Sequence, residues 1–314
     1  MEYITNTTDF HISEKTAVSL GKFDGIHRGH VRLTESLKEK KKLGLKTVIF
    51  TFDISPKQRI TGKSVNKAIT TNSEKMQLFA EKGMDYVVEC PFTPELMRME
   101  PEDFVEMIVQ RLHIKSFVVG TDFHYGYKGR GDYHLLQKLS GQYGYDVDVV
   151  DKVQENGRDI SSTYVRKEIL AGRMEAANRL LGYRYFVQGT VVHGNEIGRT
   201  IGIPTANLIP DKDKLLPPYG VYVTRTVIGG ETGRKYEGIT NVGLKPTIEG
   251  SHAVGVETHL FGFDEQIYGK EIKVEFLKWV RPEKKFDSFE ELQRQMNKDI
   301  KFGINYYTNV TEMC

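Results

Sequence analysis

The sequence predicts an α/β fold joined to an all-β fold: a parallel sheet in the first half, and in the second a small antiparallel β-barrel with a terminal helix. Two observations support this. Up to about residue 180, short apolar runs alternate with helical patterns, which is typical of a parallel sheet covered on both faces. After Gly182, short strands alternate with glycine turns, which is typical of a compact barrel. We therefore expect two domains, residues 1–183 and 184–314.

The strands expected in the first half are runs rich in valine, isoleucine and aromatic residues. They read TAVSLG, KTVIFTF, DYVVEC, SFVVG and YDVDVV. Helical patterns follow near residues 28–43, 73–82, 101–111 and 132–140, and two more near 162–171 and 174–181 close this half. Such a sheet binds ligands in the loops after its strands, where the strand order reverses.

The second half contains five strand-like runs separated by glycines. They read YFVQGTVVHG, YGVYVTRTVIGG, KYEGITNVGL, AVGVETHLFGF and KEIKVEFLKWV. The stretch DSFEELQRQMNKDIKFGINYY then has the spacing of one amphipathic helix.

Composition excludes several functional classes. The 314 residues carry 44 Lys and Arg against 42 Asp and Glu, so no basic field predicts nucleic-acid binding. The two cysteines, Cys90 and Cys314, give neither a disulfide framework nor a zinc spacing. The polar start of the chain and the absence of a long apolar run predict a cytoplasmic protein without a membrane segment.

The stretch GKFDGIHRGH, residues 21–30, joins the first strand to the first helix and carries the strongest chemical signal. His27 and His30 could bind a metal with Asp24, but no third histidine or cysteine is near, and they could also be polar surface. Glycines at 21, 25 and 29 free the backbone for close approach, and a helix amino end attracts anions. We therefore expect a phosphate site in which both imidazoles donate to phosphate oxygens as charge builds.

Two further stretches of the first half carry polar groups after a strand or at a helix start. In ISSTYVR, residues 160–166, a serine could simply cap the helix, but Arg166 one turn inside opposes the helix dipole unless an anion is bound. Hydroxyls with an arginine suit a triphosphate. The loop TDFHYGYKGRGD, residues 121–132, could be ordinary mobile surface or part of the site.

In the second half, GRTIGIPTANL places Thr205 and Asn207 after a proline and on one side of an extended segment. A plain turn is the alternative. In AVGVETHLF, Glu257 and His259 lie opposite an apolar strand face. By itself such a glutamate is usually solvent-exposed, although a carboxylate near an attacking hydroxyl can act as a general base.

These stretches together resemble the bifunctional riboflavin kinase/FMN adenylyltransferases, the prokaryotic FAD synthetase family, over almost the whole chain. GKFDGIHRGH, VVGTDFHYG and ISSTYVR resemble the motifs of a Rossmann-like nucleotidyltransferase unit. The resemblance implies that this unit binds ATP through Gly21, Phe23, Asp24, Gly25, His27, His30, Asp122, Ser162, Thr163 and Arg166, with the two histidines catalytic.

GRTIGIPTANL and the run from residue 241 to 299 resemble the riboflavin kinase unit. The resemblance implies ATP and Mg²⁺ binding by Gly202, Pro204, Thr205 and Asn207, with Thr205 and Asn207 at the metal, Glu257 as catalytic base and Arg281 near the flavin. The implied ligands are ATP, riboflavin, FMN and FAD, with no nucleic acid, membrane or protein partner.

Two positions depart from the family pattern. Lys22 stands where the family has Asn, and Ser55, in TFDISP, stands where it has His. One alternative is therefore a riboflavin kinase with an impaired or altered adenylyltransferase half. Another is a flavin-sensing protein without turnover, although binding alone would not need two phosphate sites and a base.

Overall fold

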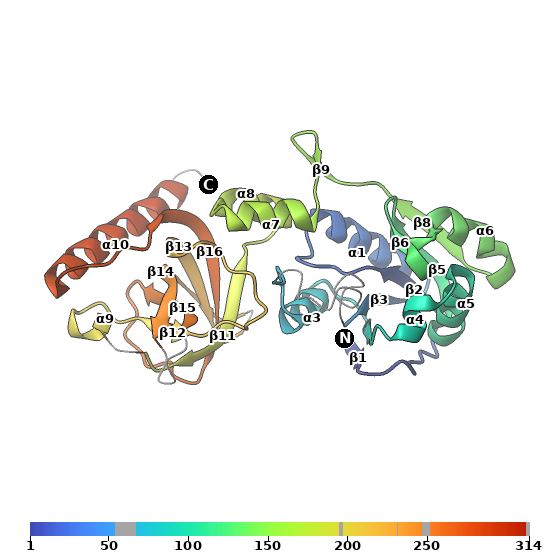
Figure 1. Cartoon of the computed structure of the whole chain (residues 1–314), viewed down its shortest axis with the longest axis horizontal. Helices are drawn as coiled ribbons and strands as arrows, with labels where there is room; N and C mark the ends of the chain where they lie inside the picture. The colour runs from blue at the N-terminus through green and yellow to red at the C-terminus, as the bar shows by residue number, and fades with distance from the viewer. Residues whose placement is uncertain (54–66, 195–196, 231, 247–251, 312–314) are drawn as a thin grey trace. The chain divides into compact units, whose positions relative to one another are not determined.

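The computed structural model describes residues 1–53, 67–194, 197–230, 232–246 and 252–311. The chain divides into two compact units, Met1–Ser162 and Thr163–Cys314 (Figure 1). The predicted boundary after residue 183 falls at the end of helix α8 (Met174–Leu181), inside the second unit. The described helices include none that is both long and apolar enough to span a membrane.

The first unit is built on a six-stranded sheet in which every pair of neighbours is parallel, as predicted. Its order is β1-β4-β3-β2-β5-β8, with the bounds Glu2–Thr5 (β1), Thr16–Leu20 (β2), Lys46–Phe52 (β3), Tyr86–Cys90 (β4), Ile114–Gly120 (β5) and Asp146–Val150 (β8). The sequence analysis missed only the edge strand β1 of this sheet. Because the chain adds strands on one side of β2 and then crosses to β5 on the other, the strand order reverses between β2 and β5.

Helices pack against the sheet (Figure 1), and all but α4 were predicted. They are α1 (Arg28–Lys41), α3 (Asn72–Glu81), α4 (Pro94–Arg98), α5 (Pro101–Leu112) and α6 (Tyr133–Tyr143). Small elements complete the unit: the hairpin β6 (His124–Tyr125) and β7 (Gly131–Asp132), the 3₁₀ turn η1 (Tyr127–Gly129), and the hairpin β9 (Gln154–Glu155) and β10 (Arg158–Asp159). Alternate residues of the strands, such as Leu20 and Phe50, join Phe104 of α5 in one buried core.

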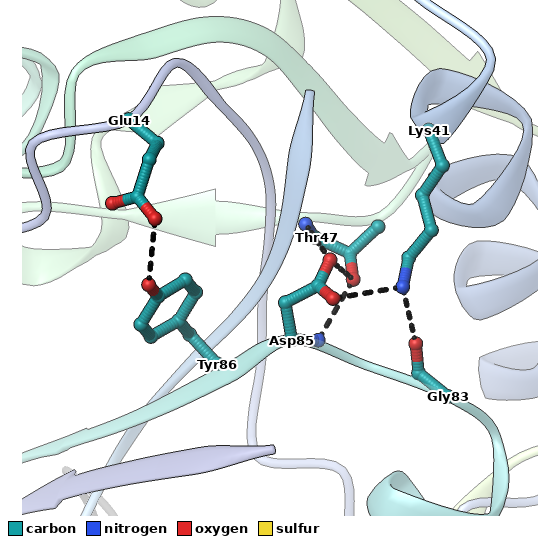
Figure 2. Close-up of polar contacts among 6 residues, drawn as sticks. All are labelled: Glu14, Lys41, Thr47, Gly83, Asp85 and Tyr86. Atoms are coloured by element: carbon teal, nitrogen blue, oxygen red, sulfur yellow. Dashed lines mark hydrogen bonds and ion pairs between the residues drawn. The ribbon is translucent and has the colours of Figure 1, made fainter. Parts of the chain in front are cut away.

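A polar network fixes the register of β3 and β4 at the end of the sheet opposite the loops that carry the motifs (Figure 2). The Asp85 carboxylate accepts hydrogen bonds from the Thr47 backbone N–H at 2.8 Å and from the Thr47 hydroxyl at 2.9 Å. Lys41 of α1 donates to the same carboxylate at 2.9 Å and to the Gly83 carbonyl at 2.7 Å. Burial alone raises the pKa of Asp85, but these hydrogen bonds outweigh it and lower the pKa.

The second unit contains the predicted closed barrel and terminal helix. The barrel order is β11-β12-β15-β14-β13-β16, with the bounds Phe186–Val192 (β11), Ala206–Leu208 (β12), Gly220–Ile228 (β13), Arg234–Pro246 (β14), His252–Leu260 (β15) and Glu271–Pro282 (β16). The helices are α7 (Ser162–Leu170), α8, α9 (Ile197–Thr200) and α10 (Phe289–Thr311). Helix α8 is tied to the barrel by Asn178, which donates to the Phe276 carbonyl at 2.9 Å and accepts from the Tyr185 N–H at 2.7 Å.

Candidate active sites

The loop between β2 and α1 lies where the strand order of the sheet reverses, and its backbone is strained. Phe23 and Ile26 have φ values of 49° and 38°, a region that a β-branched residue such as Ile26 rarely adopts. The Asp24 carboxylate accepts from the Ile69 N–H at 2.8 Å, and the Ser162 hydroxyl donates to the Asp24 carbonyl at 2.8 Å. Contacts from both sides therefore hold the loop in a conformation that it would not keep alone.

The two motif histidines lie together at the amino end of α1. His27 is the N-cap residue of α1, and its ring stacks on that of His30 with the centroids 3.8 Å apart and the planes 19° apart. The Phe23 ring packs against that of His30, with the centroids 5.1 Å apart. A Cβ atom at Gly29 would lie 3.1 Å from the His27 ring, so a glycine keeps room for this stack.

Burial keeps both imidazoles neutral near pH 7. Desolvation lowers the pKa of His27 to about 4, although the carboxylates of Asp24 and Asp122 oppose the shift. Desolvation, and then the neighbouring His27, lower the pKa of His30 well below its ordinary value. The Nδ1 atoms of both rings are buried without a hydrogen-bond partner among the described residues. An anion bound here would favour protonation of the imidazoles. The first turn of α1 carries no acidic residue that would repel such an anion.

The structure places the other residues predicted for the first site as follows. Asp122 follows β5, across the strand-order reversal from His27, and forms an ion pair with Lys152 at 3.2 Å. Gly21 directly follows β2, and an added Cβ there would lie 3.2 Å from the Phe23 ring. Thr163 and Arg166 lie on α7 in the second unit, so their contribution to this site stays a prediction. Ser55 lies outside the described residues.

The metal alternative for the histidine pair finds no support among the residues that the structure describes. They contain no group of three or more His, Cys, Asp or Glu residues that could hold a metal ion. Sequence reasoning missed Lys75 of α3, which is 8% exposed and interacts electrostatically with Asp24 and Glu89. A lysine inside an ordinary amphipathic helix gives no sequence signal of burial.

Beside the loop lies a cavity of about 480 Å³, here called the aromatic pocket. Its lining residues come from β2, β3, α4, α5 and the loop around β6. They are Leu20, Gly21, Lys22, Phe50, Thr51, Phe52, Phe92, Leu96, Met97, Phe104, Phe123, His124, Tyr125, Gly126, Lys128 and Gly129. Its volume and its aromatic walls suit a flat heteroaromatic ligand. Sequence analysis did not predict this pocket.

In the barrel, strand pairing brings the two kinase motifs together. Strands β12 and β15 pair so that Asn207 lies opposite Glu257 and Ala206 opposite Thr258. Thr205 and Glu257 line one cavity of about 240 Å³, together with Arg281. Thr205 and Pro204 also line a neighbouring cavity of about 260 Å³. Thr205 therefore lies between two cavities. This position suits a phosphate chain that runs from a ligand in one cavity to a ligand in the other.

Three further contacts shape the turn that carries Pro204, Thr205 and Asn207. The buried Asn207 amide donates to the Thr205 carbonyl at 3.3 Å. A Cβ at Gly194 would lie 2.7 Å from the Asn207 side chain, so only a glycine allows this approach. His259 forms a hydrogen bond from Nδ1 to the Pro204 carbonyl at 2.8 Å and thus ties the turn to the strand of Glu257. Sequence reasoning gave His259 no role, and its position on the Glu257 side of the strand was the available signal.

Arg281, expected near the flavin, lines the same cavity as Glu257 and also joins the barrel to α10. Its guanidinium meets the Asp299 carboxylate with two donors, at 3.0 Å from Nε and 2.7 Å from Nη2. Asp299 is 3% exposed. The bidentate pair fixes the guanidinium at the cavity wall, and its Nη1 donates to the Pro282 carbonyl at 3.0 Å.

The two units thus carry two separate candidate sites, and their folds and motifs define a transferase with a nucleotidyltransferase fold followed by a kinase barrel. Residues 9–164 match the FAD synthetase family, and residues 181–307 match the riboflavin kinase family. The two matched ranges do not overlap.

Curated relatives match along nearly the whole length. The bifunctional riboflavin kinase/FMN adenylyltransferase of Listeria monocytogenes is 35% identical over 295 residues, 93% of each chain. Those of Bacillus subtilis (34% over 301 residues, 94% of each chain) and Escherichia coli K12 (35% over 288 residues, 91% of each chain) are similar. The chain therefore belongs to the family of bifunctional riboflavin kinase/FMN adenylyltransferases.

A solved structure agrees in fold. A Streptococcus pneumoniae crystal structure titled "Macrolide-efflux Protein" superposes with a TM-score of 0.83 at 31% identity, covering 96% of this chain and 98% of the other. The likeness covers both units, so the sheet and the barrel occur in one chain there as well.

Proposed function

We propose that the second unit transfers the γ-phosphate of ATP to the 5′-hydroxyl of riboflavin, and that the first unit then joins AMP to the FMN formed, releasing pyrophosphate. One observation supports this proposal most strongly: in each unit, side chains of the sequence motifs lie next to a cavity. The enzyme therefore acts as both riboflavin kinase and FMN adenylyltransferase.

In the kinase reaction, Glu257 accepts the proton of the riboflavin hydroxyl as its oxygen attacks the γ-phosphorus of ATP. The bond from that phosphorus to the bridging oxygen breaks, and ADP leaves. Glu257 and Thr205 line the same cavity, so the base and the phosphate-binding turn reach one space. Arg281 at the wall of this cavity contacts the flavin.

In the adenylyl transfer, a phosphate oxygen of FMN attacks the α-phosphorus of ATP, and the bond to pyrophosphate breaks. His27 and His30 donate hydrogen bonds to the phosphate oxygens as charge builds, and the amino end of α1 adds its dipole. The flavin ring occupies the aromatic pocket. Asp24 holds the loop in place through Ile69, while Asp122, Ser162, Thr163 and Arg166 bind the nucleotide.

Mg²⁺ fits the donor set of the kinase turn. The ion binds oxygen ligands, keeps several waters and commonly takes only one or two protein ligands together with substrate phosphates. The hydroxyl of Thr205 and the amide oxygen of Asn207 supply such ligands, with Gly202 and Pro204 shaping the backbone around them. When bound, Mg²⁺ neutralises phosphate charge.

The functional boundary is proposed at residues 183 and 184, because every kinase residue lies after it. Helix α8 supports the barrel through Asn178, so a fragment of residues 163–314 is expected to be more stable than one of residues 184–314, although both phosphorylate riboflavin. The cytoplasmic location stays a prediction.

One assay tests the function. Purified protein is incubated with riboflavin, ATP and Mg²⁺, and riboflavin, FMN and FAD are separated by chromatography. FMN is expected first and FAD after it. FMN accumulating without FAD, even with added FMN and ATP, would favour a kinase with an impaired first unit. Absence of both products would overturn the proposal.

A further inference from the structure

The aromatic pocket carries charge of one sign only. Among the described residues that line it, Lys22 and Lys128 are the charged ones, and neither an aspartate nor a glutamate is present. Most of the remaining lining is aromatic or aliphatic. A pocket with apolar walls and cationic side chains suits a ligand with an apolar body and an anionic group.

The two lysines reach the pocket from separate loops. Lys22 follows Gly21 in the loop after β2, and Lys128 lies in η1, where its φ of 54° is in the left-handed region. Both residues are exposed. Neither ammonium group forms an ion pair or a hydrogen bond with a described residue, and Lys128 Nζ lies 5.1 Å from the Tyr127 ring centroid. Both charges are therefore available to a ligand.

We propose that Lys22 and Lys128 make the first unit selective for a flavin that carries a phosphate, so that FMN is bound in preference to riboflavin. The inference rests on the proposed function of this unit. Both flavins place the same ring in the pocket, so the apolar walls cannot distinguish them. Only FMN gains the attraction of the two ammonium groups, because riboflavin is neutral.

The phosphoryl oxygens that these lysines attract could in principle belong to ATP. The position of the lysines favours the flavin phosphate, because both line the aromatic pocket. The histidine pair, by contrast, lies at the amino end of α1, and neither histidine is among the residues that line the pocket. Selection at this point keeps riboflavin from occupying the adenylylation site.

The test measures FAD formation from FMN at saturating ATP in the full chain. The variants are Lys22→Asn, Lys128→Met, the double change, and Lys22→Arg, which keeps the charge. Lys138→Met, an exposed lysine of α6 outside the pocket, is the matched control for loss of one charge. Lumiflavin, a flavin ring with no phosphate and no hydroxyl to phosphorylate, is added as a competitive inhibitor and reports affinity for the ring alone.

Each neutral substitution is expected to raise the KM for FMN roughly 5- to 10-fold, within the range of a typical net hydrogen-bond contribution in water. The inhibition constant of lumiflavin and the KM for ATP should stay within about twofold, since neither depends on a charge–flavin phosphate contact. Lys22→Arg and Lys138→Met should behave like the unmodified chain. Added salt should raise the KM for FMN in the unmodified chain more than in the double variant.

An unchanged KM for FMN in the double variant would overturn the proposal. So would a rise in the KM for ATP alone, which would assign the lysines to the nucleotide, or an equal rise in the lumiflavin constant, which would indicate a damaged pocket. The proposed function is judged separately, because it requires only that the unmodified chain converts FMN and ATP to FAD.

Discussion

Acidification is expected to destabilise the first unit through His27. The pKa of about 4 in the folded chain lies below the ordinary value of 6.5, because burial disfavours the charged ring. As the pH falls, the unfolded chain therefore binds the proton first, and folding stability declines. The full stability is present above pH 6.5, is lost progressively as the pH falls to about 4, and changes no further below that through this group.

The magnitude follows from the shift of roughly 2.5 pKa units, each worth about 1.36 kcal/mol. The free energy of unfolding of the first unit should thus fall by about 3 kcal/mol from this group between pH 7.5 and pH 4. At pH 5 the loss should be about 2 kcal/mol. The variant His27→Gln cannot take up this proton, so its free energy of unfolding should not show this pH-dependent loss.

The assay is urea unfolding of both proteins at several pH values, followed by circular dichroism. Trp279, the sole tryptophan of the chain, lies on β16 in the second unit, so its fluorescence identifies the transition of that unit. The other transition then belongs to the first unit. On acidification, the free energy of unfolding of the wild type should fall by about 3 kcal/mol relative to that of His27→Gln. A difference that stays constant within about 0.5 kcal/mol would refute a buried neutral His27.

Two further predictions concern contacts outside the reacting groups. His259→Ala removes the hydrogen bond to the Pro204 carbonyl, so the KM for ATP in riboflavin phosphorylation should rise about 10-fold, while FAD formation from supplied FMN stays normal. Steady-state kinetics with an unchanged KM would show that the turn is held without His259. Asp85→Ala leaves the buried Thr47 N–H without its acceptor and should destabilise the first unit by about 2–3 kcal/mol in urea unfolding. A loss below about 0.5 kcal/mol would contradict the network in Figure 2.

Local patterns made much of the fold predictable. Five strands of the sheet are apolar runs between helical patterns, and five strands of the barrel lie between glycine turns. The edge strand β1, Glu2–Thr5, was not predicted, because it is short and half exposed and so has no apolar pattern. Strand β12 is only three residues long and forms because Asn207 pairs with both neighbouring strands.

The sites were predictable only in part, because they combine local and distant residues. His27 and His30 meet because three positions separate them at a helix start. Asn207 and Glu257 meet through the register of β12 and β15, which the sequence does not reveal. The aromatic pocket draws Phe50, Phe104 and others from separate elements, and each of them alone looks like an ordinary core residue.

The measurement that tests the two-site account most directly compares two single substitutions in both reactions. His30→Ala removes a donor to the charge that builds during adenylyl transfer, a loss typically of about 10²–10³ in rate. Glu257→Ala removes the base of the kinase reaction, a loss of roughly 10²–10⁴. Riboflavin phosphorylation and FAD formation from supplied FMN are measured for both variants, with circular dichroism confirming that each is folded.

The account predicts that His30→Ala loses FAD formation and keeps riboflavin phosphorylation near normal, whereas Glu257→Ala does the reverse. Each variant then serves as the control for the other, because the two side chains lie in different units. A single substitution that silenced both reactions in a folded protein would contradict the assignment of two independent sites.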